Sequence, residues 1–97
     1  MTKYDIQFEE ADTNGRAFLK LDGETKAEMT FSKAGDSIII IDHTEVSDDL
    51  RGQGVGRQLL DKLVAVVREQ GKSVIPLCPY AKSVFDKDES IRDVLRG

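Results

Sequence analysis

The chain has 97 residues, of which 39% are hydrophobic and 33% charged, and its formal net charge is −4. This length and composition indicate one soluble domain over residues 1–97, large enough for a single hydrophobic core. The acidic balance excludes a general nucleic-acid-binding protein, which needs a basic surface, and favours a cationic partner such as an amine.

The first third of the chain predicts an antiparallel meander of strands. Residues 4–9 alternate apolar and polar side chains, which is typical of a half-buried strand. Asn14 and Gly15 predict a hairpin turn over residues 12–15, because both can take the positive φ angles that such a turn requires. Alternation resumes in residues 17–21 and again in residues 27–31, with turn residues after each segment, so two further strands are expected.

A fourth strand is expected in the centre of the sheet. Residues 38–41 are four consecutive isoleucines, so both faces of this strand should be covered. The strand continues through residues 42–46, where polar side chains appear. Polar groups at the carboxyl end of a central strand, just before a glycine-rich loop, are typical of a ligand site.

The last part of the chain combines helices with one more strand. Apolar residues recur at spacings of three and four over residues 54–70, which predicts an amphipathic helix that Gly71 ends. Residues 73–78 predict a fifth strand, whose pairing Pro76 interrupts because proline has no N–H group. Short helices should follow from Pro79 onward. The fold class is therefore α/β (α+β): a mixed, mostly antiparallel sheet with one main helix after the fourth strand and short C-terminal helices.

Gly52, Gly54 and Gly56 stand where the fourth strand gives way to the main helix. Each would cost about 1 kcal/mol relative to alanine inside a helix, so helix stability does not explain them. They expose backbone N–H groups beside a helix N-terminus, which carries positive charge, and Arg51 and Arg57 add more. This combination predicts an anion site.

The residues around these three glycines distinguish between the known kinds of glycine-rich loop. A P-loop needs Gly-Lys-Ser/Thr, which does not follow here, and the dinucleotide fingerprint needs a glycine where Arg57 stands. The pattern that fits is Arg-x-x-Gly-x-Gly, formed by Arg51, Gly54 and Gly56. Together with Glu45-Val46 and the Pro-Leu-Cys-Pro-Tyr run at residues 76–80, it resembles the small, minimal members of the GNAT (Gcn5-related N-acetyltransferase) superfamily. The resemblance extends over about residues 4–95.

This resemblance implies an enzyme that transfers the acetyl group of acetyl-coenzyme A to an amine acceptor. In the GNAT fold the fourth and fifth strands splay apart and admit the pantetheine arm of the cofactor, and the glycine loop binds its pyrophosphate. Tyr80 could protonate the departing thiolate, although packing is the alternative, and Phe85 could contact the cofactor arm from the core. The implied cofactor-binding residues are Thr44, Glu45, Val46, Arg51, Gly52, Gln53, Gly54, Val55, Gly56, Arg57, Cys78, Tyr80 and Phe85.

The candidate catalytic residues are Cys78, His43 and Glu45. Cys78 should precede a helix opened by Pro79, and a helix N-terminus lowers a thiol pKa. Its thiolate could attack the thioester and form an acetyl-cysteine, or Cys78 could be an ordinary buried side chain. His43 could be a base for the amine, could help to ionise Cys78, or could be structural. Glu45 shares a strand face with His43 and is the rival base.

The sequence leaves the acceptor and two alternative functions open. Residues 9–15 leave room only for a tight turn where larger GNAT enzymes carry helices, so we expect an acceptor site that is shallow, open or completed by a partner. The acceptor could be a small amine or a protein. A coenzyme A or acyl-CoA-binding module without turnover is one alternative function, and an interaction domain whose loop serves packing is another. The two arginines disfavour the second.

Other features bear on location and assembly. The single cysteine excludes an internal disulfide and suits a reducing cytoplasm. The longest apolar run, residues 38–41, is far too short to span a bilayer, and residues 1–5 do not resemble a signal peptide. We therefore expect a cytoplasmic monomer that binds no membrane and no metal.

Overall fold

The computed structural model describes residues 3–96, which form one five-stranded sheet with its strands in chain order. The first four strands are antiparallel to their neighbours, and β5 runs parallel to β4. This confirms the predicted mixed, mostly antiparallel sheet. The strands are β1 (Gln7–Glu10), β2 (Asn14–Leu21), β3 (Glu24–Ala34), β4 (Ile38–Val46) and β5 (Ser73–Pro76). The helical elements are η1 (Asp48–Leu50), α1 (Val55–Gln70), α2 (Pro79–Lys87) and η2 (Glu89–Val94).

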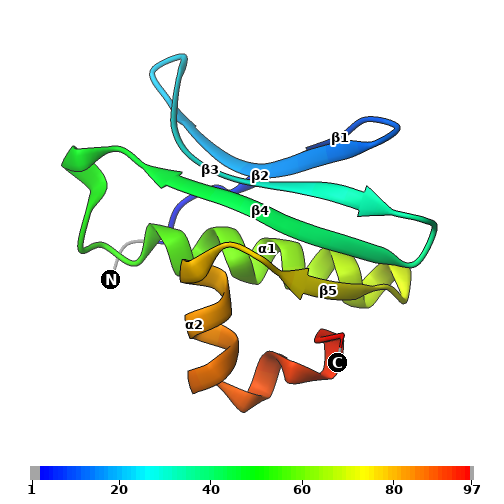
Figure 1. Cartoon of the computed structure of the whole chain (residues 1–97). Helices are drawn as coiled ribbons and strands as arrows, with labels where there is room; N and C mark the ends of the chain where they lie inside the picture. Colours follow the sequence, from blue (N-terminus) through cyan, green and yellow to red (C-terminus); the bar gives the residue numbers. More distant parts are fainter. Residues whose placement is uncertain (1–2, 97) are drawn as a thin grey trace.

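The helices cover one face of the sheet and leave the other face open. Figure 1 shows α1, α2 and the C-terminal segment on the same side of the sheet, with β1, β2 and β3 curving away from them. The core lies between α1 and the sheet. Its largest fully buried side chains are Leu19, Met29, Phe31, Ile41, Val55, Leu59, Leu60, Leu63, Val64, Val67, Val74 and Phe85. The helix α1 ends as predicted at Gly71, whose φ of 66° is in the left-handed region.

The isoleucines of β4 show the asymmetry of the two faces. Ile39 and Ile41 are buried against the helices, whereas Ile38 and Ile40 are half-buried. The prediction that both faces of this strand are covered is therefore wrong for the described chain, because the helices all lie on one side of the sheet.

The predicted hairpin joins β1 and β2, but its turn lies at residues 11–13 and not at Asn14 and Gly15. Both residues already belong to β2, and Gly15 pairs with Glu10 on one side and Phe31 on the other. Its φ is not positive. A Cβ at Gly15 would lie 2.5 Å from the Phe31 Cζ and 2.7 Å from the Glu9 carbonyl oxygen, so the close approach of neighbouring groups requires glycine here.

A bulge in β4 determines which side chains face which side of the sheet. Thr30 pairs with His43 and Phe31 with Ile41, which leaves Asp42 as an extra residue in β4. Beyond the bulge, Thr44 and Val46 pair with the buried Met29 and Ala27 and share their face. His43 and Glu45 consequently face the open side, on the same face as each other, as the two-residue period predicts.

Within residues 3–96, no helix has both the length and the apolar character needed to cross a membrane.

Candidate functional site

β4 and β5 pair over only part of the length of β4. Their register ends where Ile41 lies opposite Pro76. The N–H groups of Leu77 and Cys78 then both donate to the Ile41 carbonyl oxygen, at 3.1 and 2.9 Å. From there β4 continues to Val46, while the other chain turns into α2. The edge of β4 beyond Ile41 is thus free of β5, and it can pair with an extended ligand through its backbone groups.

The loop from β4 to α1 concentrates backbone N–H groups at one point. Gly52 and Gly54 have φ angles of 78° and 75°, in the left-handed region that favours glycine. The α1 N-cap, Gly54, makes no side-chain cap hydrogen bond, and the first turn of α1 has no acidic residue. The positive end of the helix is therefore uncompensated by this chain, which is the arrangement that attracts an anion.

A cavity of about 240 Å³ lies between this loop and the free end of β4. It brings together predicted cofactor residues from the strand, the loop and the helix α2. Its lining residues are Thr44, Val46, Leu50, Arg51, Gly52, Gly54, Val55, Gly56 and Tyr80. Leu50, which sequence reasoning missed, contributes an apolar wall, since it is buried at the end of η1.

Tyr80 lies directly against the start of α1. A Cβ at Gly56 would be 3.0 Å from the Tyr80 Cζ and 3.1 Å from its hydroxyl oxygen, so glycine at this position leaves the space that the ring occupies. Burial raises the pKa of the Tyr80 phenol, whereas the charge of Arg57 lowers it. The phenol is therefore protonated at neutral pH, in a residue that lines the cavity.

The two arginines of the loop have different surroundings. The Arg51 side chain is 74% exposed, and its Nε lies 3.1 Å from the Asp48 carboxylate. Arg57 instead bonds to two carboxylates, Asp61 at 2.8 Å and Asp88 at 2.6 Å. Arg51 can therefore turn toward a ligand, while Arg57 already joins α1 to the start of η2.

Cys78 is buried at the N-cap position of α2. Its Sγ lies 3.1 Å from the Thr44 Oγ1, and either atom could be the donor. The first turn of α2 contains no acidic residue. The thiol thus lies beside the point where β4 and β5 separate, on the face of the sheet that the helices cover.

His43 and Glu45 lie on the other face of β4. Their side chains are 61% and 70% exposed, and the His43 Nε2 is 3.8 Å from the Glu45 Oε1. The strand separates them from Cys78, whose side-chain partner is Thr44. The structure therefore brings His43 and Glu45 together but not His43 and Cys78.

Two other predicted cofactor residues lie outside the cavity. Phe85 is fully buried in the core. Gln53 accepts a hydrogen bond from the Tyr4 hydroxyl and donates one to the Asp49 carbonyl oxygen at 3.3 Å. Tyr4 also donates its backbone N–H to the Gln58 Oε1 at 2.8 Å. Sequence reasoning missed Tyr4, because nothing local in residues 3–6 points to a loop far along the chain.

In the part of the chain that the structure describes, no group of three or more histidine, cysteine and acidic residues could hold a metal ion.

Residues 16–94 match the family described as GCN5-related N-acetyl-transferase. The structure is similar to the NMR structure of a GCN5-like protein from Staphylococcus aureus, with 34% identity, a TM-score of 0.71 and coverage of 94% of this chain and 88% of that one. No curated protein sequence matches the chain.

Two more distant structures share the fold. The ribosomal-protein-alanine N-acetyltransferase from Brucella melitensis biovar Abortus 2308 is 20% identical over 79% of this chain and 62% of that one, with a TM-score of 0.66. AAC(6′)-Iy, in complex with a bisubstrate analogue of CoA and acetylneamine, is 14% identical over 84% of this chain and 62% of that one, with a TM-score of 0.55. The present chain thus spans less than two thirds of the length of both proteins.

Proposed function

The chain belongs to the GCN5-related N-acetyltransferase family, and from this premise we propose that it transfers the acetyl group of acetyl-coenzyme A to an amine acceptor, with the cofactor bound between β4 and α1. The observation that carries this placement is the cavity between the free edge of β4 and the uncapped N-terminus of α1. AAC(6′)-Iy has the same fold and holds an analogue built on CoA, which supports the choice of cofactor.

The cofactor would lie along β4 and end at the glycine loop. The pantetheine arm carries amide groups, which would pair with the backbone of Thr44, Glu45 and Val46 where β5 has turned away. The pyrophosphate would accept hydrogen bonds from backbone N–H groups of residues 52–57, with the Arg51 guanidinium beside it. Arg57 contributes positive charge nearby. Because its guanidinium is already hydrogen-bonded to two carboxylates, it would stabilise the loop rather than bind the ligand.

Direct transfer requires one base and one acid. The neutral amine nitrogen attacks the thioester carbonyl carbon, the carbon–sulfur bond breaks, and the nitrogen loses its extra proton. His43 or Glu45, both exposed on the open side, would accept that proton, directly or through water. Tyr80, protonated and in the cavity wall, would give a proton to the leaving thiolate.

Transfer through Cys78 is the second route. Its thiolate would attack the acetyl carbon and expel the coenzyme A thiolate, which Tyr80 would protonate, leaving an acetyl-cysteine that the amine then cleaves. The position of the thiol at the N-cap of α2, beside the point where β4 and β5 separate, supports this route. Thr44 would orient the sulfur through the 3.1 Å contact.

The test is a thermal-shift measurement with coenzyme A, acetyl-coenzyme A and ATP in parallel. A ligand at about 100 times its dissociation constant adds roughly 2.7 kcal/mol of stability. We expect stabilisation by the two coenzyme A species alone, reduced in Arg51→Ala and abolished in Gly54→Val. No shift with any ligand would refute the cofactor site.

A binding module without turnover is the competing function. No described helix covers the open face of the sheet, so an acceptor bound there would not be enclosed. Binding of coenzyme A without acetylation of any amine in a broad panel would favour it. The cytoplasmic location and the monomeric state stay predictions, which cell fractionation and size-exclusion chromatography with light scattering would check.

A further inference from the structure

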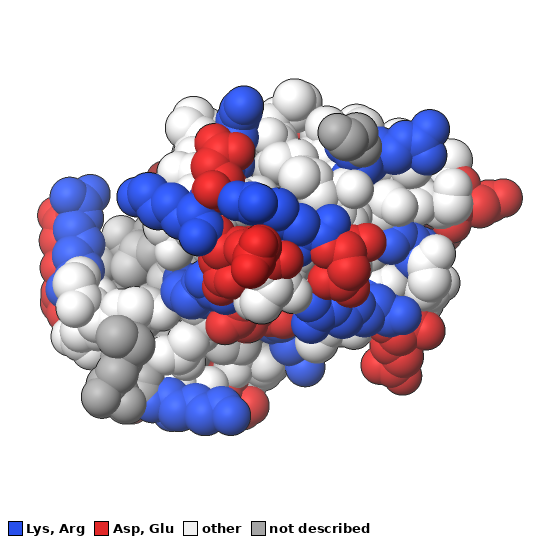
Figure 2. Space-filling model, turned by 90° about the horizontal axis from the view of Figure 1, so that it is seen from below, with Lys and Arg blue, Asp and Glu red and all other residues white. Residues whose placement is uncertain are grey.

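Within residues 3–96, two large hydrophobic side chains are exposed, and both lie where α2 begins. Leu77 is 65% exposed and Tyr80 is 38% exposed. The helix side of the molecule is different, since Figure 2 shows basic and acidic side chains interleaved there. Tyr80 lines the cavity between β4 and α1, so its ring has a place in the proposed cofactor site. Leu77 does not line that cavity, and its exposure needs a separate explanation.

The backbone holds Leu77 at the point where β4 and β5 separate, which we call the fork. The Leu77 N–H donates to the Ile41 carbonyl oxygen at 3.1 Å, and the Cys78 N–H donates to the same oxygen at 2.9 Å. Pro76 and Pro79 stand on either side of this pair and restrict the backbone there. The position of Leu77 is therefore fixed by β4, and its side chain stays beside the fork.

Neighbouring side chains at the fork lie on different faces of the sheet. Val74 and Cys78 are buried on the covered face, whereas Ile75 is half-buried and Leu77 is exposed. Ile75 lies opposite Ile40 in the register of β4 and β5, and both belong to the open face. Leu77 thus follows these two isoleucines at the open side of the fork, with the Cys78 thiol on the covered side.

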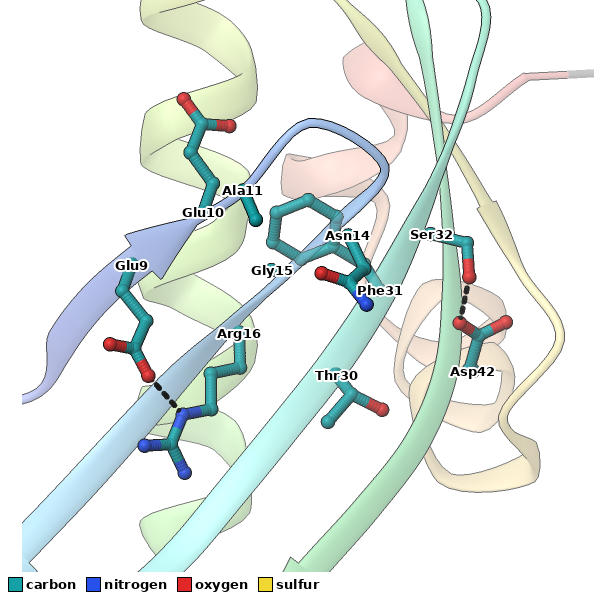
Figure 3. A pocket seen from close by; sticks show the side chains of 10 residues that line it. All are labelled: Glu9, Glu10, Ala11, Asn14, Gly15, Arg16, Thr30, Phe31, Ser32 and Asp42. Atoms are coloured by element: carbon teal, nitrogen blue, oxygen red, sulfur yellow. Dashed lines mark hydrogen bonds and ion pairs between the residues drawn. The ribbon is translucent and has the colours of Figure 1, made fainter.

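On the β3 side of the fork the open face is polar. Asp42, the extra residue of β4, accepts a hydrogen bond from the Ser32 hydroxyl. Both residues line a hollow of about 480 Å³, which also contains the Glu9–Arg16 pair (Figure 3). This hollow shares no lining residue with the cavity between β4 and α1. An apolar group at the fork would therefore find apolar neighbours on the β5 side and polar ones on the β3 side.

The proposed cofactor would bring its acyl group to the fork. With the pyrophosphate at the glycine loop, the pantetheine arm runs from Val46 back toward Ile41. If the last amide of the arm lies level with Thr44, the sulfur and the acetyl group extend roughly 7 Å further. This length corresponds to about two residues of a strand, so the acetyl methyl would lie level with Asp42, beside the fork.

We propose that Leu77 is a specificity-determining residue, whose side chain forms the outer wall of the acyl site and favours acetyl over longer acyl groups. This inference rests on the proposed cofactor site. The leucine covers the acetyl methyl and occupies the direction in which a longer chain would extend over Ile75 and Ile40. A smaller residue at position 77 would open the apolar surface of both isoleucines to longer chains, which gain affinity from each methylene they bury.

The experiment compares the binding of 2-oxopropyl-CoA and 2-oxopentyl-CoA, stable thioethers that carry the acetyl and butyryl groups. Isothermal titration should show an affinity of the native chain about tenfold higher for the shorter analogue. Leu77→Ala should reduce this ratio to about one. Its affinity for coenzyme A itself should change by less than about twofold, because Leu77 contacts only the acyl group. Leu77→Met keeps the volume of the side chain and should retain the ratio.

Ile38→Ala is the matched control. Ile38 is half-buried in β4, three residues before Ile41 and so about 10 Å from the fork. This variant should leave the ratio unchanged. A native ratio near one, an unchanged ratio in Leu77→Ala, or an equal loss of affinity for coenzyme A and both analogues would overturn the acyl wall even if the cofactor site is real. Failure of the native chain to bind any of the three ligands would overturn both proposals.

A second measurement locates the acyl group directly. In protein with labelled leucine and valine methyl groups, NMR should show a nuclear Overhauser effect between the terminal methyl of 2-oxopropyl-CoA and the Leu77 methyls. Effects only at Val46, Leu50 or Val55, which line the cavity, would place the acyl group away from the fork and refute the wall. The expected contact and affinity ratio without acetylation of any amine would support the wall and refute the transfer function alone.

Discussion

Gly15 and Gly56 are required for the space they leave and not for their backbone angles. Neither has a positive φ, yet a Cβ at either position would lie within about 3 Å of an aromatic side chain. At Gly15 the neighbours are the Phe31 ring and the Glu9 backbone. The close packing of β1, β2 and β3 at this point therefore requires a residue without a side chain. At Gly56 the neighbour is Tyr80, and both residues line the cavity between β4 and α1.

Gly15→Ala tests the first of these contacts. We expect a loss of about 1–3 kcal/mol in the free energy of unfolding, the usual cost of overpacking, measured by urea denaturation. The loss should be smaller in a Phe31→Leu background, which removes the ring atom that lies 2.5 Å from the new Cβ. An unchanged midpoint in the single variant would contradict the packing described here.

Cys78→Ala tests the acetyl-cysteine route. Cys78 lies outside the lining of the cavity proposed for the cofactor, so coenzyme A binding should persist while acetyl transfer falls by at least about a hundredfold. Intact-protein mass spectrometry after incubation with acetyl-coenzyme A should show one acetyl group on the native chain and none on the variant. Full turnover by Cys78→Ala would exclude the route and leave direct transfer. Thr44→Val, which removes the hydroxyl beside the sulfur, should slow acetylation without preventing it.

At the scale of elements, two long-range clamps hold the loop between β4 and α1. The segment before β1 reaches the loop through Tyr4, whose hydroxyl donates to Gln53 and whose N–H donates to Gln58. On the other side, Arg57 joins the first turn of α1 to Asp88, the N-cap of η2. The position of the glycine-rich loop therefore depends on segments from both the N-terminal and the C-terminal part of the chain.

Tyr4→Phe removes the hydroxyl and keeps the ring that packs against the core. We expect the dissociation constant of coenzyme A to rise by about two- to tenfold, the usual effect of one lost hydrogen bond, with a smaller change in kcat. Isothermal titration and steady-state kinetics would measure the two effects. A drop in kcat at constant affinity would assign Tyr4 a different role.

The Arg57–Asp88 clamp predicts a pH dependence of stability. Hydrogen bonds from Ser90 and from Arg57 lower the pKa of Asp88 to about 2, below its ordinary value of 3.8. A depressed carboxyl pKa adds stability above about pH 4, and this contribution is lost as the pH falls toward 2. Asp88→Asn should therefore lower the melting temperature at pH 7 and differ little from the native chain near pH 2. Glu89→Gln is the control, since it removes a neighbouring charge and leaves the Arg57 contact in place.

The arrangement of elements was largely predictable from local patterns, and the contacts between them were not. Periodicity and glycine placement predicted the five strand segments, the amphipathic helix and the loop that lines the cavity. The space required at Gly15 and the carboxylate partners of Arg57 depend on residues distant in sequence, which no local pattern reveals. The bulge at Asp42 is a third example, because the residues around it read as one uninterrupted strand.

At the scale of the whole molecule, one sheet separates two environments. The covered face holds the core, Cys78 and the cavity between β4 and α1, and the open face holds His43 and Glu45. The end of β4 contributes to the lining of the cavity through Thr44 and Val46, and to the open face through His43 and Glu45. The proposed transfer would therefore take place at the edge of this strand.

The bulge at Asp42 determines which side chains of β4 face the helices and which face the open side. Side chains alternate between the two faces of a strand, so one extra residue exchanges the faces for all residues after it. With Asp42 present, Thr44 and Val46 are directed to the face that the helices cover, and His43 and Glu45 are directed to the open face. Removing one residue here would exchange the two sets and turn Thr44 and Val46 outward, with composition almost unchanged. A substitution in β4 therefore changes one side chain, whereas a single deletion at the bulge would turn all the side chains of residues 43–46 to the opposite face of the sheet.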